Sequence, residues 1–363
     1  MKLISLYLIR RLSVMSGYAL LALLALYSFF DVVKEAAETG SGGYTGATAA
    51  KYVLMQLPAH AYQLMPLAVL IGGLVALNQL ASNSELAVIK TSGLSTGNIV
   101  STLLKFGLVF ALLTIILGEM IAPELSRRAD KMKIGAKIEQ TAAAQFGLVS
   151  TGKNGIWLRQ NNSMINIVSV LPDNTLMSVK IWRYDENFRL SEAVYAASAK
   201  VRKSRWILSD VHSSRFEGDR VLTEHKSQRE WPSSAGRRLL SVLAVKPEQM
   251  SLRALTDYIR YLETNRQQST EYRVAWWNKL IYPVATLVMA LVALAFTPVS
   301  GRSSNMGMKL FGGICLGLLF YFAGRLFGFT SRLYGIPPAL AAALPTAAFA
   351  LAAVWLIRRQ EKR

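Results

Sequence analysis

Few residues of this chain have types and spacings that could support chemistry. Residues 147–154 nearly match the phosphate-binding loop G-x-x-x-x-G-K-[ST], but Asn154 stands where a Ser or Thr hydroxyl would hold magnesium. The segment after it, 155–158, has the pattern of a strand, whereas a phosphate loop must open a helix. The three histidines are His60, His212 and His225. They are far apart in the sequence and lack H-E-x-x-H spacing, so we expect no catalytic residue, no metal ion and no cofactor.

The composition indicates a membrane protein rather than a nucleic-acid-binding protein. The chain has 363 residues, of which 52% are hydrophobic, and a mean hydropathy of +0.30. A formal net charge of +19 would by itself suit nucleic acid, but there is no aromatic-rich RNA-binding pattern and no compact basic arm. We assign the charge to the flanks of membrane spans and to anionic lipid. The single cysteine, Cys315, excludes an intrachain disulfide.

Six apolar segments define the architecture, three before and three after about 150 polar residues. They are 14–30, 57–78, 99–122, 276–297, 308–329 and 338–357. Each approaches the ~20 residues that a helix needs to cross a hydrocarbon core. The basic N-terminus has no clear Ala-x-Ala cleavage site, so we expect a retained first helix rather than a signal peptide. The sequence predicts three parts: helices in 1–122, an inserted domain in 123–275 and helices in 276–363.

The charge of the short loops orients these spans. Loops on the side of the two termini hold ten Lys and Arg residues, against three on the opposite side. The positive-inside rule therefore places both termini in the cytoplasm. The block 123–275 is then outside the cytoplasm, because long domains cross a membrane regardless of their charge.

Short segments rich in Val, Ile, Trp and Tyr predict a β-domain inside this block. They are 156–160, 164–170, 177–184, 194–202, 206–208 and 221–225. Turn-forming residues separate them, as in an antiparallel sandwich or jelly roll. Basic residues in 124–140 predict a helix that leaves the membrane surface, and Ser251 begins an amphipathic helix over 251–262. The expected fold class is an α-helical membrane protein with six transmembrane helices and an inserted all-β, jelly-roll-like domain.

The loop between the second and third spans, near residues 82–93, predicts a short helix at the cytoplasmic membrane surface. A serine before Glu85 can cap this helix, and the Glu85 carboxylate favours its positive end. Leu86 and Ile89 form a small apolar face, and Gly93 suits the C-terminal stop. The groove of a soluble partner could hold such a helix. A plain connector is an equally good interpretation from physical arguments alone.

Three short segments, taken with the order of the spans, resemble one family of transporters. They are Ser84-Glu85-Leu86 with Ser92-Gly93, Gly118-Glu119 with Ala122-Pro123, and Tyr334-Gly335-Ile336-Pro337-Pro338 with Leu344-Pro345. In these segments, and over nearly its whole length, the chain resembles the YjgP/YjgQ (LptF/LptG) family of lipopolysaccharide-export permeases. The segment around Tyr334, together with the loop helix, favours the LptG branch over its sister LptF.

This resemblance implies a function and a set of partners. It implies that the chain pairs with LptF in the inner membrane of a Gram-negative bacterium, where the first and fifth helices form a lateral gate. Two copies of a cytoplasmic ATPase, LptB, would bind the ATP and grip the loop helices, so this chain would carry no ATPase site. Lipopolysaccharide would pass from the membrane lipids through the jelly-roll domains and LptC to a periplasmic bridge. The residues implied in ATPase contact are Ser84, Glu85, Leu86, Ile89, Ser92 and Gly93.

Charged residues near the outer membrane face are candidates for binding this substrate. Lipopolysaccharide phosphates need positive partners, and an ionisable residue within a span is a functional candidate. The candidates are Lys34, Arg128, Lys131, Lys133, Glu119 and Arg325. The chain departs from the family at the top of its first span, where Lys34 is the only base and lies beside two acids. A solvated surface explains each basic residue equally well, and Glu119 and Arg325 could pair with each other or line a cavity.

Two other functions remain open at this point. An ion-coupled secondary lipid transporter would need acidic residues at the centre of a span, whereas Glu119 lies near a span end. A membrane scaffold with a periplasmic binding domain would make Glu85 dispensable. Co-purification with an ATPase would separate the permease from both alternatives.

Overall fold

Long helices precede and follow a β-sheet along this chain, whose structure is a computed structural model. It describes residues 2–40, 44–91, 96–141, 156–170, 175–202, 205–217, 220–232, 247–297 and 306–361. The segment 147–154, which nearly matches a phosphate-binding loop, lies outside the described residues. Two compact units are present. Unit 1 comprises Met1–Asp31, Gln56–Leu125 and Thr270–Arg363, and unit 2 comprises Val32–Met55 and Ser126–Ser269.

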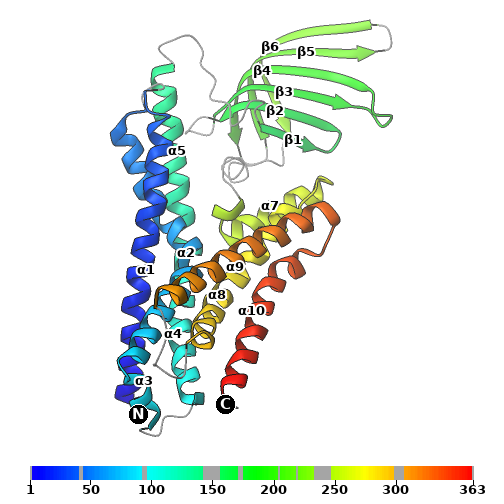
Figure 1. Cartoon of the computed structure of the whole chain (residues 1–363). Helices are drawn as coiled ribbons and strands as arrows, with labels where there is room; N and C mark the ends of the chain where they lie inside the picture. Colours follow the sequence, from blue (N-terminus) through cyan, green and yellow to red (C-terminus); the bar gives the residue numbers. More distant parts are fainter. Residues whose placement is uncertain are drawn as a thin grey trace. The chain divides into compact units, whose positions relative to one another are not determined.

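Among the described residues, six helices are long and apolar enough to cross a membrane, which confirms the six predicted spans. The helices are α1 (Lys2–Ala36), α2 (Gly46–Ser82), α4 (Thr96–Ile116), α8 (Thr270–Ala295), α9 (Met306–Tyr334) and α10 (Pro338–Glu361) (Figure 1). A π-helical turn, η1 (Leu117–Ile121), continues α4 into α5 (Ala122–Thr141). Large apolar side chains such as Leu21 of α1 and Phe322 of α9 are exposed. Lipid can cover such side chains in a membrane protein.

Helix α8 lies in the core of unit 1, where it packs against both α4 and α10. The core joins side chains from several helices, including Leu12 of α1, Leu70 of α2, Phe106 of α4 and Met289 of α8. These side chains are buried. Apolar residues far apart in the sequence therefore hold the spans of unit 1 together by close packing.

Small residues set the closest approaches between these helices. A Cβ atom added at Gly72 of α2 would overlap the backbone of Ser16 in α1. Gly313 and Gly317 of α9 likewise leave room for leucine side chains of α2. Small residues at such positions let helix backbones approach each other, which gives van der Waals contact where lipid offers no hydrophobic driving force.

Unit 2 contains one antiparallel sheet with its strands in sequence order (Figure 1). The strands are β1 (Ile156–Gln160), β2 (Ser163–Val170), β3 (Thr175–Tyr184), β4 (Leu190–Arg202), β5 (Arg205–Glu217) and β6 (Arg220–Pro232). Alternation places Val179 and Ile181 of β3 in the buried layer. The predicted fold class is confirmed, since the inserted antiparallel sheet is consistent with a jelly-roll-like domain.

The last two strands are longer than the predicted segments 206–208 and 221–225. Polar residues such as Ser213 of β5 and Glu224 of β6 continue the strands, and these two residues are direct cross-strand partners. Backbone pairing thus extends a strand beyond the residues whose side chains favour it. Among the described strands, β6 ends the sheet, and nearly all of its residues are exposed.

Two strands contain a residue in the left-handed backbone conformation. Ser178 of β3 has φ 48° and Asp210 of β5 has φ 54°. The pairing is in the same register on both sides of each, as in Ser209↔Gln228 and Val211↔Lys226 around Asp210. Asp tolerates this conformation better than most residues. In β5 the buried face switches at this point, from Trp206 and Leu208 to Val211, without a slip in register.

Unit 2 also includes helix α7 (Leu252–Thr264), as the sequence predicts for 251–262. Ser251 is its N-cap, and the side chain of Ser251 accepts a hydrogen bond from the Ala254 N–H at 3.3 Å. The buried Leu255 lies on the apolar face. The segment Val32–Met55, which the sequence analysis grouped with the membrane helices, also belongs to unit 2.

We expect Gly72→Ala to destabilise unit 1 by about 1–3 kcal/mol, the usual cost of overpacking. The added methyl group would meet the Ser16 backbone, which cannot move aside as a side chain can. Thermal unfolding of the purified protein in detergent would measure the change. The matched control is Gly17→Ala on α1, where an added Cβ has nothing within 4 Å. Equal midpoints for the two variants would contradict this packing.

Candidate functional site

A short helix, α3 (Glu85–Thr91), follows α2 as the sequence predicts. Ser84 directly precedes it with φ 63°, and its carbonyl accepts a hydrogen bond from the Val88 N–H at 3.1 Å. The change of backbone direction at Ser84 thus starts the new helix. Two of the predicted contact residues, Ser92 and Gly93, lie outside the described residues, and so does the side chain of Leu86.

The carboxylate of Glu85 is held by two hydrogen bonds. The Tyr7 hydroxyl of α1 donates to Oε2 at 2.8 Å, and the Asn83 side-chain amide donates to Oε1 at 3.2 Å. The hydrogen bond from Tyr7, followed by that from Asn83, lowers the pKa of Glu85 below its usual range. Glu85 therefore stays ionised at neutral pH and has a fixed orientation.

A groove of about 440 Å³ lies beside this carboxylate. Leu3 and Ile4 of α1 line it together with Glu85, Val88 and Ile89. The apolar residues of α3 divide between two roles: Ile89 is 8% exposed and packs into the core of unit 1, whereas Val88 is 65% exposed. The accessible surface of α3 thus combines one negative charge with an apolar side chain and an adjacent groove.

A second polar group lies within the spans of unit 1, at the π-helical turn η1. The Lys279 ammonium of α8 donates to the Gly118 carbonyl at 2.6 Å and to Glu119 Oε1 at 3.1 Å. The side chain of Lys279 is 4% exposed, and its ammonium also lies 5.8 Å from the centre of the Tyr62 ring. In η1 the Ala122 N–H bonds to the Leu117 carbonyl, five residues back. Such π-turns are frequent at functional sites.

Glycine is required at position 118 because the backbone passes close to an aromatic ring. A Cβ atom at Gly118 would lie 2.5 Å from the Tyr62 ring. Tyr62 in turn packs on Tyr282, whose hydroxyl donates to the Gln63 carbonyl at 2.7 Å. The lysine, the turn and the two rings form one packed group that joins α2, η1 and α8.

Two further polar contacts lie within the spans of unit 1. The Arg325 guanidinium of α9 donates to the Tyr321 hydroxyl at 3.0 Å. His60 of α2 contacts the Asp31 carboxylate of α1 through Nε2, and the His60 ring packs on Tyr27. Each of these groups finds a partner inside the protein, as polar groups at membrane depth must.

The basic residues predicted to bind phosphate lie in unit 2, where their surroundings differ. Lys133 of α5 contacts the Glu35 carboxylate at 2.7 Å and the Glu38 carboxylate at 2.9 Å. Its charge is therefore compensated within the protein. The other three predicted basic residues, Lys34, Arg128 and Lys131, are exposed.

Comparison with known proteins identifies the family. The model of the lipopolysaccharide export system permeases LptF/LptG matches residues 6–359. The chain belongs to this family. Permease protein LptG of Escherichia coli K12 is 32% identical over 351 residues, which cover 95% of this chain and 94% of that protein. LptG of Haemophilus influenzae is 29% identical over 304 residues, which cover 83% of each chain. The predicted resemblance is confirmed, and the chain is a multi-pass membrane protein.

Within this LptF/LptG chain, the roles of the predicted site residues stay predictions. The structure gives Glu119 a partner that the sequence analysis missed, Lys279 of α8. The sequence could have indicated Lys279, because it is a lysine within the apolar segment 276–297 and ionisable residues inside spans are functional candidates. The role of Tyr7 could not be predicted from the sequence, because a tyrosine at a span end is common. Nothing in the sequence connects Tyr7 with Glu85.

We expect the Glu119–Lys279 pair to show strong coupling in a double-mutant cycle. Glu119→Gln and Lys279→Met each leave one charge without its partner, so each should destabilise the protein. The double variant should be more stable than the sum of the single changes predicts, by about 0.5–3 kcal/mol. Thermal unfolding in detergent measures all four proteins. Lys105→Met, which removes an exposed lysine of α4, is the control, and additive effects of the pair would contradict the coupling.

Proposed function

We propose that this chain is a permease subunit of an ATP-driven transporter that extracts lipopolysaccharide from the inner membrane and passes it toward the outer membrane. The family match over residues 6–359 and the LptG relatives support this proposal. The proposal places both termini and α3 in the cytoplasm and the sheet in the periplasm. The excess of Lys and Arg in the short loops on the side of the termini supports that orientation.

The observation that carries the proposal is the fixed, ionised Glu85 at the start of α3. A soluble partner can grip a short helix that presents a charge and an apolar side chain beside a groove. We infer that this partner is the ATPase subunit, LptB, with one copy on α3 and a second copy on the sister permease LptF. ATP would bind to that subunit, and α3 would transmit its motion to α1 through the hydrogen bond between Tyr7 and Glu85.

On the periplasmic side, exposed cations of unit 2 would meet the substrate. Lipopolysaccharide carries phosphates, which form strong charge-assisted hydrogen bonds with Lys and Arg. Lys34, Arg128 and Lys131 are exposed and suit this role. Lys133, held between two carboxylates, would instead order the segment around Glu35. The sheet would then pass the lipid to LptC and the periplasmic bridge.

Ion-coupled transport is the second candidate, and two contacts inside the spans favour it. The pairs His60–Asp31 and Lys279–Glu119 place titratable groups at membrane depth, where proton relays are found. The two functions differ in their energy source. Lipid release from proteoliposomes that contain the ATPase, supplied with ATP but no ion gradient, supports the first. Release that needs a gradient and no ATP supports the second.

We expect Glu85→Arg to abolish capture of the ATPase subunit and ATP-dependent lipid release. Reversing a charge at the centre of an interface costs several kcal/mol, which would weaken binding more than about tenfold. Co-purification with the ATPase and lipid release from proteoliposomes measure the two effects. Tyr7→Phe, which leaves the charge but removes its orienting hydrogen bond, should retain capture and slow release.

The control for this experiment is Glu217→Arg, the same charge reversal at an exposed residue of β5. It should leave capture of the ATPase unchanged. If Glu85→Arg also captures the ATPase and releases lipid at the wild-type rate, α3 is a plain connector and the proposed coupling is wrong.

Charge reversal on α5 should separate a substrate contact from a structural one. Lys131→Glu replaces an exposed cation and should reduce lipid-stimulated ATPase activity and lipid crosslinking. Its thermal stability should change little, because surface substitutions usually change stability by less than about 0.5 kcal/mol. Lys133→Glu should lower the thermal midpoint, since it places a third negative charge beside Glu35 and Glu38. Unchanged crosslinking in Lys131→Glu would contradict a phosphate contact there.

A further inference from the structure

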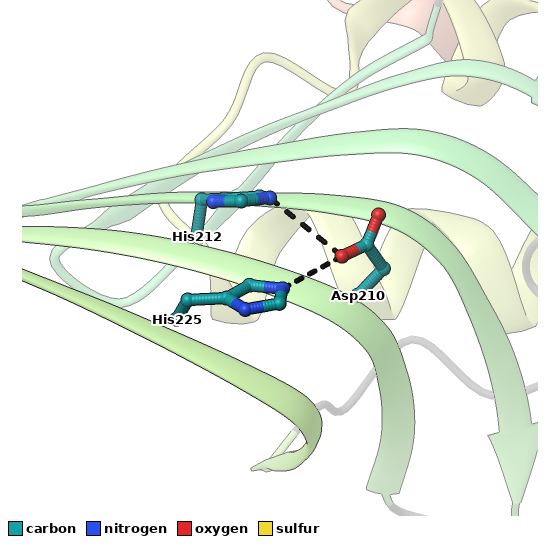
Figure 2. A group of neighbouring side chains, drawn as sticks. All are labelled: Asp210, His212 and His225. Carbon is teal, nitrogen blue, oxygen red and sulfur yellow. Dashed lines mark hydrogen bonds and ion pairs between the residues drawn. The ribbon is translucent and has the colours of Figure 1, made fainter.

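Two histidines and an aspartate that are separated in the sequence meet on the exposed surface of the sheet. His212 of β5 and His225 of β6 are direct cross-strand partners. Asp210 precedes His212 by two residues on the same strand, and both side chains are exposed. Figure 2 shows both imidazole rings directed at the Asp210 carboxylate. The antiparallel pairing of β5 and β6 thus assembles three groups that the linear spacing had separated.

The distances within this cluster suit a shared ion. Nε2 of His225 lies 2.8 Å from Asp210 Oδ1, and Nε2 of His212 lies 3.6 Å from the same oxygen. Ligands of a tetrahedral zinc ion are about 3.3 Å apart, given bond lengths near 2.0–2.1 Å. The two measured separations bracket that value. All three ligand atoms lie within 4.8 Å of one another, close enough for one ion to be reached by side-chain rotation.

We propose that Asp210, His212 and His225 bind a late first-row divalent metal ion, with Zn²⁺ as the reference ion. Imidazole ligands favour Zn²⁺, Cu²⁺ and Ni²⁺, whereas Mg²⁺ and Ca²⁺ prefer oxygen ligands. Two histidines and one carboxylate also form the three-ligand set of open zinc sites, which leave a fourth position for water or another ligand. All three side chains are more than half exposed, so an ion can reach them from solvent.

The backbone and the ring arrangement support this site. The left-handed conformation of Asp210 places its carboxylate where both rings can reach it without a change in strand register. The rings of His212 and His225 are stacked, with centroids 4.4 Å apart and planes inclined by 22°. Both Nε2 atoms face the same oxygen of Asp210 (Figure 2). A bound ion would connect β5 to β6, the last described strand of the sheet.

Zinc binding to the full-length protein tests the site. The protein is purified in detergent without a polyhistidine tag, stripped of metal with a chelator, and titrated with ZnCl₂ by calorimetry in excess Mg²⁺. We expect one Zn²⁺ per chain. His212→Gln, His225→Gln and Asp210→Asn should each weaken the affinity at least about tenfold, because even residues that only support metal ligands contribute that much. Asparagine is chosen at position 210 because it also tolerates φ 54°.

Two controls and a spectroscopic measurement make the result specific. The chain has three histidines, so His60→Gln removes the one outside the cluster and should keep wild-type zinc affinity. Glu224→Gln removes an exposed carboxylate next to His225 and should do the same. Electron paramagnetic resonance with Cu²⁺ should show two nitrogen ligands in the wild type and one in each histidine variant. No zinc binding by the wild type, equal affinity in the cluster variants, or loss in either control would overturn the proposal.

Discussion

Inside the hydrocarbon core of a membrane, polar groups must find their partners within the protein, and this constraint explains the polar side-chain contacts described within the spans of unit 1. The Lys279 ammonium shows the consequence most clearly. It contacts both a carboxylate and a backbone carbonyl of η1. The π-helical turn therefore supplies acceptors for the buried charge, and the lysine supplies a donor for the carbonyl of the turn. Neither feature would persist alone, because an unpaired lysine or an unbonded carbonyl is costly at this depth. The same rule accounts for the contact between His60 and Asp31.

The sequence predicts the parts of the fold that depend on local patterns. Hydropathy locates the six spans, alternating residues locate the strands, and Ser251 correctly marks the start of α7. The limits of β5 and β6 were wrong because pairing with a neighbouring strand extends them through polar residues. Local pattern and non-local pairing are separate sources of strand structure, and only the first can be read from one segment.

The candidate site was less predictable, because its contacts join residues that are far apart in the chain. The loop helix and its acid follow from spacing, capping and charge, but the tyrosine that orients Glu85 comes from the first helix. The partner of Glu119 lies 160 residues away. Two lysines on one helix likewise differ only through their neighbours, since Lys133 meets two acids and Lys131 is exposed. Residue type identifies such candidates, but three-dimensional surroundings decide what each can do.

The last described strand of the sheet, β6, is exposed, and this has a consequence for how the protein meets other chains. A strand that ends a sheet presents unpaired backbone groups and invites indiscriminate pairing with other chains. In β6 this backbone is flanked by charged residues of both signs, including Glu224, Lys226 and Arg229. A passing strand without complementary charges would bring like charges together and be repelled. The charges on β6 therefore disfavour indiscriminate pairing of other chains with this strand.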